Sequence, residues 1–358
     1  MNRLFFLLLA TSFLLTACVK QQIIDRITLF IVCAFDEATS DQIEFTIAAP
    51  KFQSKKPGTV SNQLLSKVAH TSVDIKELMD FQLSRPINEG RLSVILFGKD
   101  VAANGLAREL DVALRDARAS RKMFLAVVDG KAKTLLDANF SSDEEKGLFL
   151  FNLLDSNRRN GRLPLQNLHE FEYSNMGKGM DPFLPLLKLQ NDQVVITGLA
   201  LFKDDKYVES INEKQMRLMK LLLKDAENGV CEVKFEDGSY VTVRNLGSKV
   251  RYRISKDTKT ANLSINLVLK GEIIESRGVH YPKQELEKIK KSLENELTTT
   301  GMQLIDLFKT EGIDPLGLGD FARSKTRNWN EEEWKKEYRA LNVHLNVKVT
   351  LSEIGIKK

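Results

Sequence analysis

The chain has 358 residues, of which 42% are hydrophobic and 28% charged, and it carries a formal net charge of +5 at pH 7. This hydrophobic share is enough to build packed cores, and the length predicts two or three domains of ordinary size. The positive charge is small and dispersed, and Lys and Arg form no run with interleaved aromatic residues. We therefore expect no nucleic-acid partner.

The first eighteen residues have the pattern of a bacterial lipoprotein export signal. A basic residue precedes an apolar run over residues 4–15, and Leu15-Thr16-Ala17-Cys18 has the aliphatic, small, small, cysteine order of a lipobox. The run is well short of the roughly 20 residues that a helix needs to cross a bilayer. The lipobox order also disfavours the alternative, an N-terminal hydrophobic strand or helix with a chance cysteine.

Signal peptidase is expected to cut between Ala17 and Cys18 and so to remove the signal peptide, residues 1–17. The thiol of Cys18 is then expected to carry a diacylglycerol, and its amino group an acyl chain such as palmitate. Acyl chains contribute on the order of 0.8 kcal/mol for each buried methylene, so two chains anchor a protein stably where one does so only marginally. The sequence therefore predicts a membrane lipoprotein, anchored through Cys18 on the extracytoplasmic face.

Residues 18–186 are expected to form an N-terminal α/β-type domain, because strand and helix patterns alternate along them. The expected strands cover residues 27–35, 43–47, 92–97 and 124–128, and the expected helices cover residues 61–81, in one or two pieces, and 101–118. Residues 157–178 lack periodicity and are expected to form a long exposed loop. A small middle domain is expected over residues 187–227, with two strands and one helix.

Residues 228–358 are expected to form a C-terminal domain of antiparallel sheet with one long helix. Asp237-Gly238 between apolar runs predicts a hairpin. Apolar and polar residues alternate over 263–269 and 341–351, which is typical of strands with one buried face. The long helix between these strands is expected to stop at Gly312. The whole pattern predicts the α+β class, with several domains in which mixed or antiparallel sheets pack with helices.

Catalytic and metal-binding patterns are missing from the sequence. No nucleophile elbow, Walker loop or dinucleotide-binding glycine motif occurs. The glycines of residues 314–320 predict a structural turn, and the acidic groups 204–205 and 331–333 fit a polar turn and a helix start. No histidine has another histidine or a cysteine at metal-ligand spacing; the four are His70, His169, His280 and His344. We expect no catalytic residue, no metal, no cofactor and no enzymatic activity.

Two cysteines remain besides Cys18. Cys33 lies in an apolar run and Cys231 at the start of an expected strand. A disulfide between them is compatible with a location outside the cytoplasm, but isolated cysteines so far apart in sequence are more often small buried hydrophobes. The sequence leaves both possibilities open.

Several motifs of the middle and C-terminal segments occur together in one known family. They are Leu184-Pro185-Leu186, the run from Ile196 to Lys203 with Asp205-Lys206, the stretch from Asp314 through Trp329-Asn330 to Trp334, and the closing Val343, Val347 and Val349. On these motifs the chain resembles the Ger(x)C spore germination lipoproteins, the C subunits of nutrient germinant receptors in endospore-forming bacteria. Weaker N-terminal similarities extend the likeness over nearly the whole mature chain; they involve Asp25, Pro50, Ser93 to Gly105 and Ala126-Val127-Val128.

The resemblance implies a lipid-anchored subunit that docks on the integral membrane A and B subunits of a germinant receptor and enables nutrient-triggered germination. Its partners would be membrane lipid, through Cys18, and these two subunits, in the spore inner membrane. Family members usually carry Gly-Cys-Trp-Asp at the lipidated cysteine, whereas this chain has Ala17-Cys18-Val19-Lys20, which keeps the lipobox chemistry. Direct binding of a small molecule stays open. The alternative is a lipid-anchored extracytoplasmic solute-binding protein or enzyme; a solute-binding protein would show two similar α/β lobes around a cleft.

Overall fold

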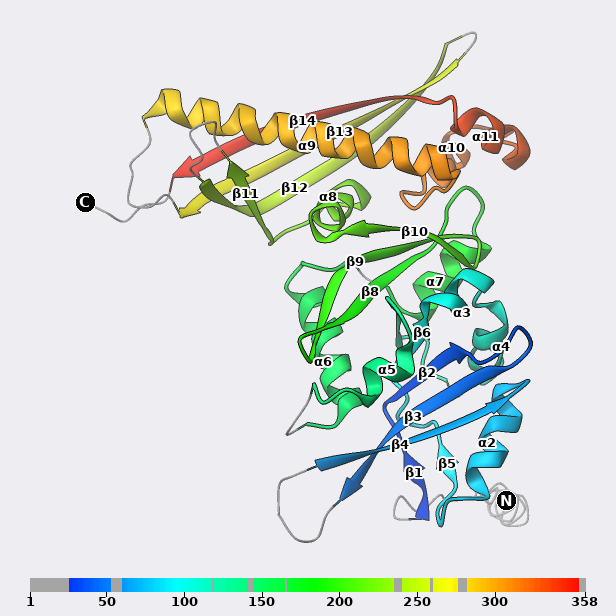
Figure 1. The fold of residues 1–358 in the computed structure, drawn as a ribbon. Coiled ribbons are helices and arrows are strands. Elements are labelled where there is room, and N and C mark those ends of the chain that lie inside the picture. Colours follow the sequence, from blue (N-terminus) through cyan, green and yellow to red (C-terminus); the bar gives the residue numbers. More distant parts are fainter. Residues whose placement is uncertain are drawn as a thin grey trace, which may run out of the picture.

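The computed structural model of the chain describes residues 26–52, 60–117, 119–140, 144–164, 166–234, 240–257, 260–275 and 282–353. These residues form two units that meet at helix α8 (Glu213–Leu223). The first unit is an eight-stranded sheet with helices on both faces, and the second is a four-stranded sheet packed on the long helix α9 (Lys283–Glu311). Figure 1 shows one unit above the other, with α8 between them.

The large sheet has a parallel centre and antiparallel edges. Its central strands pair in parallel, and they are β2 (Val32–Glu37), β6 (Val94–Gly98), β7 (Phe124–Val128) and β8 (Phe183–Gln190). Because helices cover both faces, β6 and β7 are buried at every residue and form continuous apolar runs. Antiparallel strands complete the two edges: β3 (Ile43–Phe52) and β4 (Val60–Ala69) beside β2, and β9 (Gln193–Lys203) and β10 (Lys206–Asn212) beside β8.

Alternate side chains of these strands enter two separate cores, one on each face of the sheet. The first core includes residues of α2 (Ser72–Asp80), α3 (Lys99–Asn104), α4 (Ala107–Arg115) and α7 (Leu168–Met176). The second includes residues of α5 (Ala132–Asp137), α6 (Lys146–Arg159) and α8. A short parallel pair, β1 (Thr28–Leu29) and β5 (Ile87–Asn88), lies at the end of this unit that is farthest from the C-terminal sheet (Figure 1).

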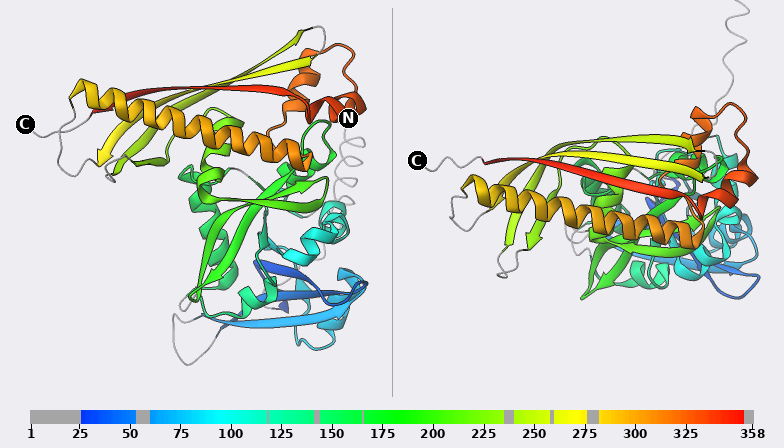
Figure 2. Two further views of the ribbon diagram at one scale, coloured as in Figure 1. Left: turned by 45° about the horizontal axis from the view of Figure 1, so that its top comes forward. Right: turned by 90° about the horizontal axis from the view of Figure 1, so that it is seen from above.

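The C-terminal sheet contains, in order, β11 (Val230–Lys234), β12 (Tyr240–Asp257), β13 (Thr260–Glu275) and β14 (Asn342–Glu353). The first three strands are antiparallel, whereas β14 runs parallel to β13 after the chain has returned through α9, α10 (Leu318–Lys325) and α11 (Glu331–Tyr338). One face of the sheet packs on α8 and α9, so the second core of the large sheet continues into the C-terminal unit. Figure 2 shows α9 running along the length of this sheet.

The expected α+β class is confirmed, with mixed sheets and a C-terminal sheet packed with one long helix. The helix α9 ends where the sequence predicts, because Gly312 follows it with φ 67°, a left-handed conformation that favours glycine. The turn at Asp237-Gly238 lies outside the described residues, and the strands on either side of it pair antiparallel. The two units differ in size, strand direction and placement of helices, so they are not the two similar lobes of a solute-binding protein.

The helix expected over residues 61–81 is wrong for its first half. Residues 60–69 form β4, and the helix α2 covers only residues 72–80. Leu64, Leu65 and Val68 fit helical spacing, but β4 pairs with β3 along its full length, and this pairing decides the backbone conformation.

The long loop expected over residues 157–178 is also wrong. The helix α6 extends to Arg159, and α7 begins at Leu168. Only Leu168 and Phe171 of α7 are buried. Two buried residues are too few to produce a recognisable period in the sequence.

Residues 187–227, expected to form a small middle domain, are hydrogen-bonded to the segment before them. They supply β9 and β10, which extend the edge of the large sheet from β8. They also supply α8, which lies between the two sheets and contributes residues to their shared core.

Candidate functional site

The residues predicted to carry the membrane anchor, Ala17 and Cys18, lie outside the described residues, and the anchor stays a prediction. The described chain enters β1 at the end of the N-terminal unit opposite the C-terminal sheet (Figure 1). Cys18 precedes Arg26 by eight residues, a distance of at most roughly 29 Å in an extended chain. An anchor at Cys18 would therefore hold the β1 end of the molecule close to the membrane.

None of the helices in the described part of the chain combines the length and the apolar character that crossing a membrane requires. Across the same residues, no group of three or more His, Cys, Asp or Glu side chains could hold a metal ion. The exposed His70 pairs with Asp41 at 3.0 Å, and His344 lies 3.2 Å from the Asn342 amide. His280 lies outside the described residues.

Cys33 and Cys231 are both free thiols in the structure. Cys33 is buried in β2, where burial raises the pKa of its thiol well above the usual value. Cys231 is half-buried in β11, and burial raises the pKa of its thiol as well. A raised pKa keeps a thiol protonated and unreactive. Cys33 therefore has the character of a small buried hydrophobe, whereas Cys231 is only half-buried.

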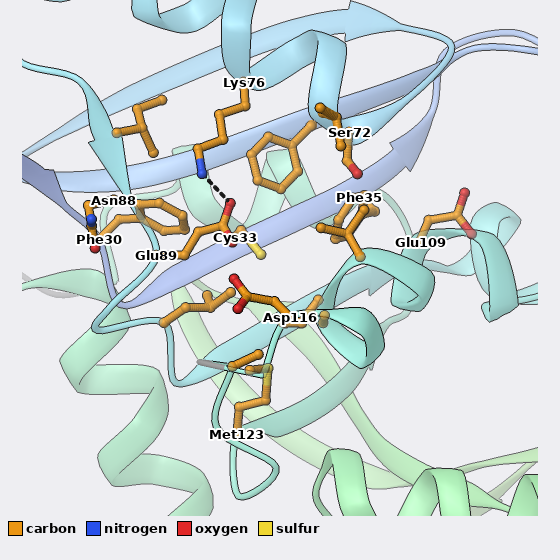
Figure 3. A pocket seen from close by; sticks show the side chains of 18 of the residues that line it. Phe30, Cys33, Phe35, Ser72, Lys76, Asn88, Glu89, Glu109, Asp116 and Met123 are labelled. Atoms are coloured by element: carbon orange, nitrogen blue, oxygen red, sulfur yellow. Dashed lines mark hydrogen bonds and ion pairs between the residues drawn. The ribbon is translucent and has the colours of Figure 1, made fainter. Parts of the chain in front are cut away.

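A cavity of about 530 Å³ opens on one face of the large sheet, and we call it the N-terminal cavity. Its floor is apolar, with Phe30, Cys33, Phe35, Phe45 and Ile95. Helices α2 and α4 and the segment after β5 form its walls (Figure 3). Ligand pockets in proteins have this size and this mostly apolar lining.

Charged side chains line this cavity from three separate segments. Lys76 of α2 donates a hydrogen bond to Glu89 at 3.0 Å, and both side chains are about one third exposed. Asp116 ends α4. Figure 3 shows the carboxylates of Glu89 and Asp116 directed toward the same part of the cavity, close to the sulfur of Cys33. The polar groups thus converge above the apolar floor.

Glu109 of α4 also lines the N-terminal cavity and is only 6% exposed. Burial raises the pKa of its carboxyl group, and the nearby charge of Asp205 raises it further. Its Oε1 lies 3.7 Å from Nε of Arg108. Its Oε2 accepts no hydrogen bond from any described residue, and such a buried orphan acceptor is unusual in a folded protein.

Hydrogen bonds around a group of aspartates join the two units. The N–H of Asp181 donates to the carbonyl of Asp314 at 3.0 Å, and the N–H of Asp320 donates to the carbonyl of Gly179 at 2.9 Å. The Asp181 carboxylate in turn accepts from the N–H groups of Asp204, at 3.1 Å, and Asp314, at 2.7 Å. We call this crossing of residues 178–182 and 313–320 the junction.

Asp314 is the most buried acid of the junction. Its carboxylate accepts hydrogen bonds from the N–H groups of Leu318, at 2.9 Å, and Gly319, at 2.7 Å, and so caps α10. Burial raises its pKa to about 7, and the charge of Asp181 adds to this rise. Burial also raises the pKa of Asp181. The junction therefore supports the fold by tying the two units together.

The C-terminal sheet leaves one of its faces uncovered, and we call it the open face. Buried and exposed residues alternate along its strands, so that Val250 faces α8 and α9 while Lys249 and Arg251 face outward. Asn266 and Asn346 hydrogen-bond across β13 and β14 on this side at 3.2 Å. Its described charged side chains are six cations and two acids: Arg244, Lys249, Arg251, Arg253, Lys270, Lys348, Glu232 and Glu272. The open face is therefore basic, and it also exposes apolar side chains at Val230, Leu246, Val268 and Ile274.

Sequence patterns singled out none of the charged residues of the N-terminal cavity or of the open face. Lys76, Glu89 and Asp116 are isolated in sequence and meet only through the packing of α2, β5 and α4. The open face had a detectable signal, because the polar positions between buried residues of 263–269 and 341–351 mark an uncovered side. Its basic character depends on β12, where Lys and Arg occupy the outward positions.

Comparison with known proteins bears on the whole chain. Residues 20–189 match the family model described as spore germination protein N-terminal domain, and residues 197–355 match the model described as spore germination B3/GerAC like, C-terminal. The chain is 27% identical over 355 residues to the spore germination protein GerQC of Bacillus cereus, an alignment that covers 98% of each protein. It also shares the fold of the crystal structure of the GerBC protein, with a TM-score of 0.61 at 20% identity over 89% of this chain and 96% of that one. Since the two family models together span nearly all of the described residues, the chain belongs to the Ger(x)C family of spore germination proteins.

Proposed function

We propose that this chain is the lipid-anchored C subunit of a nutrient germinant receptor, and that it docks on the integral membrane A and B subunits. The match of both halves of the chain to spore germination families carries this proposal. The lipobox at Leu15-Thr16-Ala17-Cys18 supplies the anchor. Anchoring converts a solution encounter with the membrane subunits into a local one at raised effective concentration. Its role is to complete the receptor, without catalysis of its own.

The anchor is tested by the substitution Cys18→Ala. The variant lacks the thiol that accepts the diacylglycerol, so it should leave the membrane fraction of spores, and germination in response to nutrients should fall. Cys231→Ala is the matched control, because it removes a half-buried thiol that is far from the lipobox in the sequence, and this variant should stay with membranes. Membrane retention of the Cys18→Ala variant at the level of the unmodified protein would contradict the proposal.

We assign docking to the open face of the C-terminal sheet and to an acidic surface of a receptor subunit. Lys249, Arg253, Lys270 and Lys348 make no ion pair with a described residue and project from adjacent strands, so a complementary acidic surface would meet all four at once. Complementary charge steers association and sets specificity. The β1 end lies at the opposite pole, so the anchor leaves this face accessible (Figure 1).

Charge reversal tests this surface in the receptor. The open-face variant K249E/R253E/K270E/K348E should no longer co-purify with the A and B subunits from spore membranes, while it stays membrane-bound through Cys18. The control variant K122E/K131E/K206E/K291E places the same number of reversals on other exposed lysines and should co-purify as the unmodified chain does. Equal co-purification of both variants would place the docking surface elsewhere.

A further inference from the structure

We propose that a pocket between the two units binds a small organic anion, which carries a carboxylate or a phosphate group on a short apolar body. The pocket has about 390 Å³, which suits a small molecule. The end of α6 with the turn after it, the helix α8, and β11 with the residues before it all contribute to its walls. We call it the interunit pocket. Its ligand goes beyond anchoring and docking, because none of the four open-face cations assigned to docking lines it.

Basic side chains outnumber acidic ones around the interunit pocket. Three of the described residues that line it are basic and one is acidic: Arg162, Arg217, Lys220 and Glu213. Arg217 donates a hydrogen bond to Glu213, and this ion pair neutralises both groups. Arg162 and Lys220 make no ion pair with a described residue. Two cations thus line the pocket without a counter-charge, and an anion is the ligand that they favour.

Lys220 gives the stronger indication, because its charge is buried. The residue is 8% exposed, and its ammonium donates to the carbonyl of Gly161 and, at 3.4 Å, to that of Glu227. Its Nζ lies against the pocket wall, since a methyl group placed on Gly161 would approach it to 2.8 Å. Burial lowers the pKa of this amine, and the nearby charge of Lys224 lowers it further. Buried charges in proteins are normally paired, and an anion in the pocket would supply the missing partner.

Arg162 supplies the second charge from the neighbouring turn. It follows Gly161 directly, the residue whose carbonyl accepts from Lys220. Its side chain is exposed, and its guanidinium makes no hydrogen bond with a described residue. A guanidinium pairs with carboxylate and phosphate groups through two parallel hydrogen bonds. The two unpaired cations therefore belong to adjoining segments of one pocket.

Apolar side chains select the rest of the ligand. They line the same pocket from α8, β9, β11 and the turn after α6, and they are Leu163, Ile196, Met216, Leu221 and Cys231. An alkyl or aryl body would be buried favourably against them. A bare inorganic ion would leave this surface without a contact. We therefore expect an organic anion to bind better than an inorganic one.

Calorimetry on the full chain, purified in a non-ionic detergent, tests the charge of the ligand. The probes are 3-phenylpropionate and phenyl phosphate as anions, 2-phenylethanol as the neutral compound and phenethylammonium as the cation. We expect saturable binding of an anion alone, weakened by salt because charge attraction contributes. The better of the two anions then decides between carboxylate and phosphate. Binding of the neutral compound or of the cation as tightly as the anions, or no saturable binding of any probe, would overturn the proposal.

Substitutions at Arg162 then locate the bound anion without disturbing the core. Arg162→Gln should weaken binding by about tenfold or more, since it removes a charged donor, whereas Arg162→Lys should keep most of it. Arg159→Gln is the matched control, because it changes the net charge equally at an exposed arginine that pairs with Asp155 and does not line the pocket. Equal weakening by both glutamine variants would show that the anion responds to net charge and not to this pocket, and would overturn the proposal.

Lys220→Met should abolish binding of the anion. It also removes the hydrogen bonds to Gly161 and Glu227, so its unfolding temperature is measured beside that of the unmodified chain. If this variant unfolds, the exposed Arg162 variants still decide the matter.

Cys231 offers a second way to locate the anion, because its half-buried thiol lines the pocket. At a probe concentration of ten times the Kd, alkylation of Cys231 by N-ethylmaleimide should slow by roughly tenfold, as followed by mass spectrometry. Alkylation at an unchanged rate, while calorimetry shows saturation, would place the anion outside the pocket and overturn the proposal. None of these measurements needs the A and B subunits, so their failure and a failure of the receptor proposal are distinguishable.

Discussion

Single aspartates, such as the buried Asp36 and the half-buried Asp181, connect segments that are far apart in the sequence. Asp36 of β2 accepts hydrogen bonds at 2.7 Å from the N–H groups of both Ala132 and Lys133 and so caps α5. Asp181 accepts from Asp204 and Asp314 in the junction. Two backbone donors for each carboxylate offset part of the free energy lost when a charge is buried. These side chains hold strand ends and helix starts in register.

Asp314 should make the stability of the protein depend on pH near neutrality. In the folded chain its carboxyl keeps a proton up to a pKa of about 7, whereas an unfolded aspartate loses it near roughly 3.9. Between these values the folded state binds the additional proton, so the free energy of unfolding falls as the pH rises. Denaturant unfolding at pH 5 and pH 8 should show lower stability at pH 8, by on the order of 1 kcal/mol or more.

The substitution Asp314→Asn removes this titration, so the decline between pH 5 and pH 8 should become smaller than in the unmodified chain. The variant should also be less stable at both pH values, because one amide oxygen cannot replace the two oxygens that accept from the N–H groups of Leu318 and Gly319. Asp111→Asn alters an exposed carboxylate and should keep the full decline. An unchanged decline in Asp314→Asn would assign the pH dependence to other groups.

Gly319 allows the two segments of the junction to cross. A methyl group at this position would lie 2.4 Å from Nε1 of Trp334 and 2.6 Å from Cα of Gly179. Gly319→Ala should therefore lower the free energy of unfolding by about 1–3 kcal/mol, measured in denaturant. At Gly247 a methyl group would meet no heavy atom within 4 Å, so Gly247→Ala is the control and should change stability little. Similar losses in both variants would refute the close packing at Gly319.

At the scale of elements, the sequence predicted those strands and helices in which the spacing of the apolar residues itself indicates the conformation. The alternation in 263–269 gave β13, and the apolar stripe that ends at Gly312 gave α9. Both elements bury one face against a core, so their apolar residues recur in the sequence with the period of a strand or of a helix. The lipobox of residues 15–18 is also a local pattern, and the anchor that it predicts stays a prediction.

Other elements depend on partners that the local sequence does not reveal. The edge strand β4 has apolar residues at helical spacing, and only its pairing with β3 makes it a strand. The parallel direction of β14 follows from the route of the chain through α9, α10 and α11. The N-terminal cavity is a stronger case, because Lys76, Glu89 and Asp116 come together only when α2 and α4 pack on the sheet.

The helix α9 should contribute much of the stability of the C-terminal unit. Leu304 belongs to its buried stripe and has no exposed surface, in the core shared with β13 and β14. Leu304→Ala should cost about 2–5 kcal/mol in unfolding free energy, because it removes buried methyl groups and leaves a cavity. Leu78→Ala removes the same atoms from a side chain that is 39% exposed and should cost clearly less. Equal costs would mean that α9 is not packed on the sheet as described.

At the scale of the whole molecule, the two poles carry different proposed roles. The β1 end continues toward the lipobox, and the open face lies on the unit at the other pole (Figures 1 and 2). The core that passes through α8 links the two units, and so do the hydrogen bonds of the junction. These links should fix the orientation of the two units relative to each other. We therefore expect the anchored protein to stand away from the membrane instead of lying along it.

Energy transfer to the lipid surface tests this orientation. A dye on an introduced cysteine at Ser84, which is exposed next to β5, should transfer energy efficiently to rhodamine-labelled lipid in vesicles that hold the acylated protein. The same dye at Ser255, exposed on β12 in the C-terminal sheet, should transfer much less. Both labels are placed in a Cys231→Ser background, and the Cys18→Ala variant, which lacks the acyl anchor, should show no transfer from either site. Transfer from Ser255 equal to or greater than that from Ser84 would mean that the C-terminal sheet lies on the membrane, and the open face would then contact lipid in place of a partner subunit.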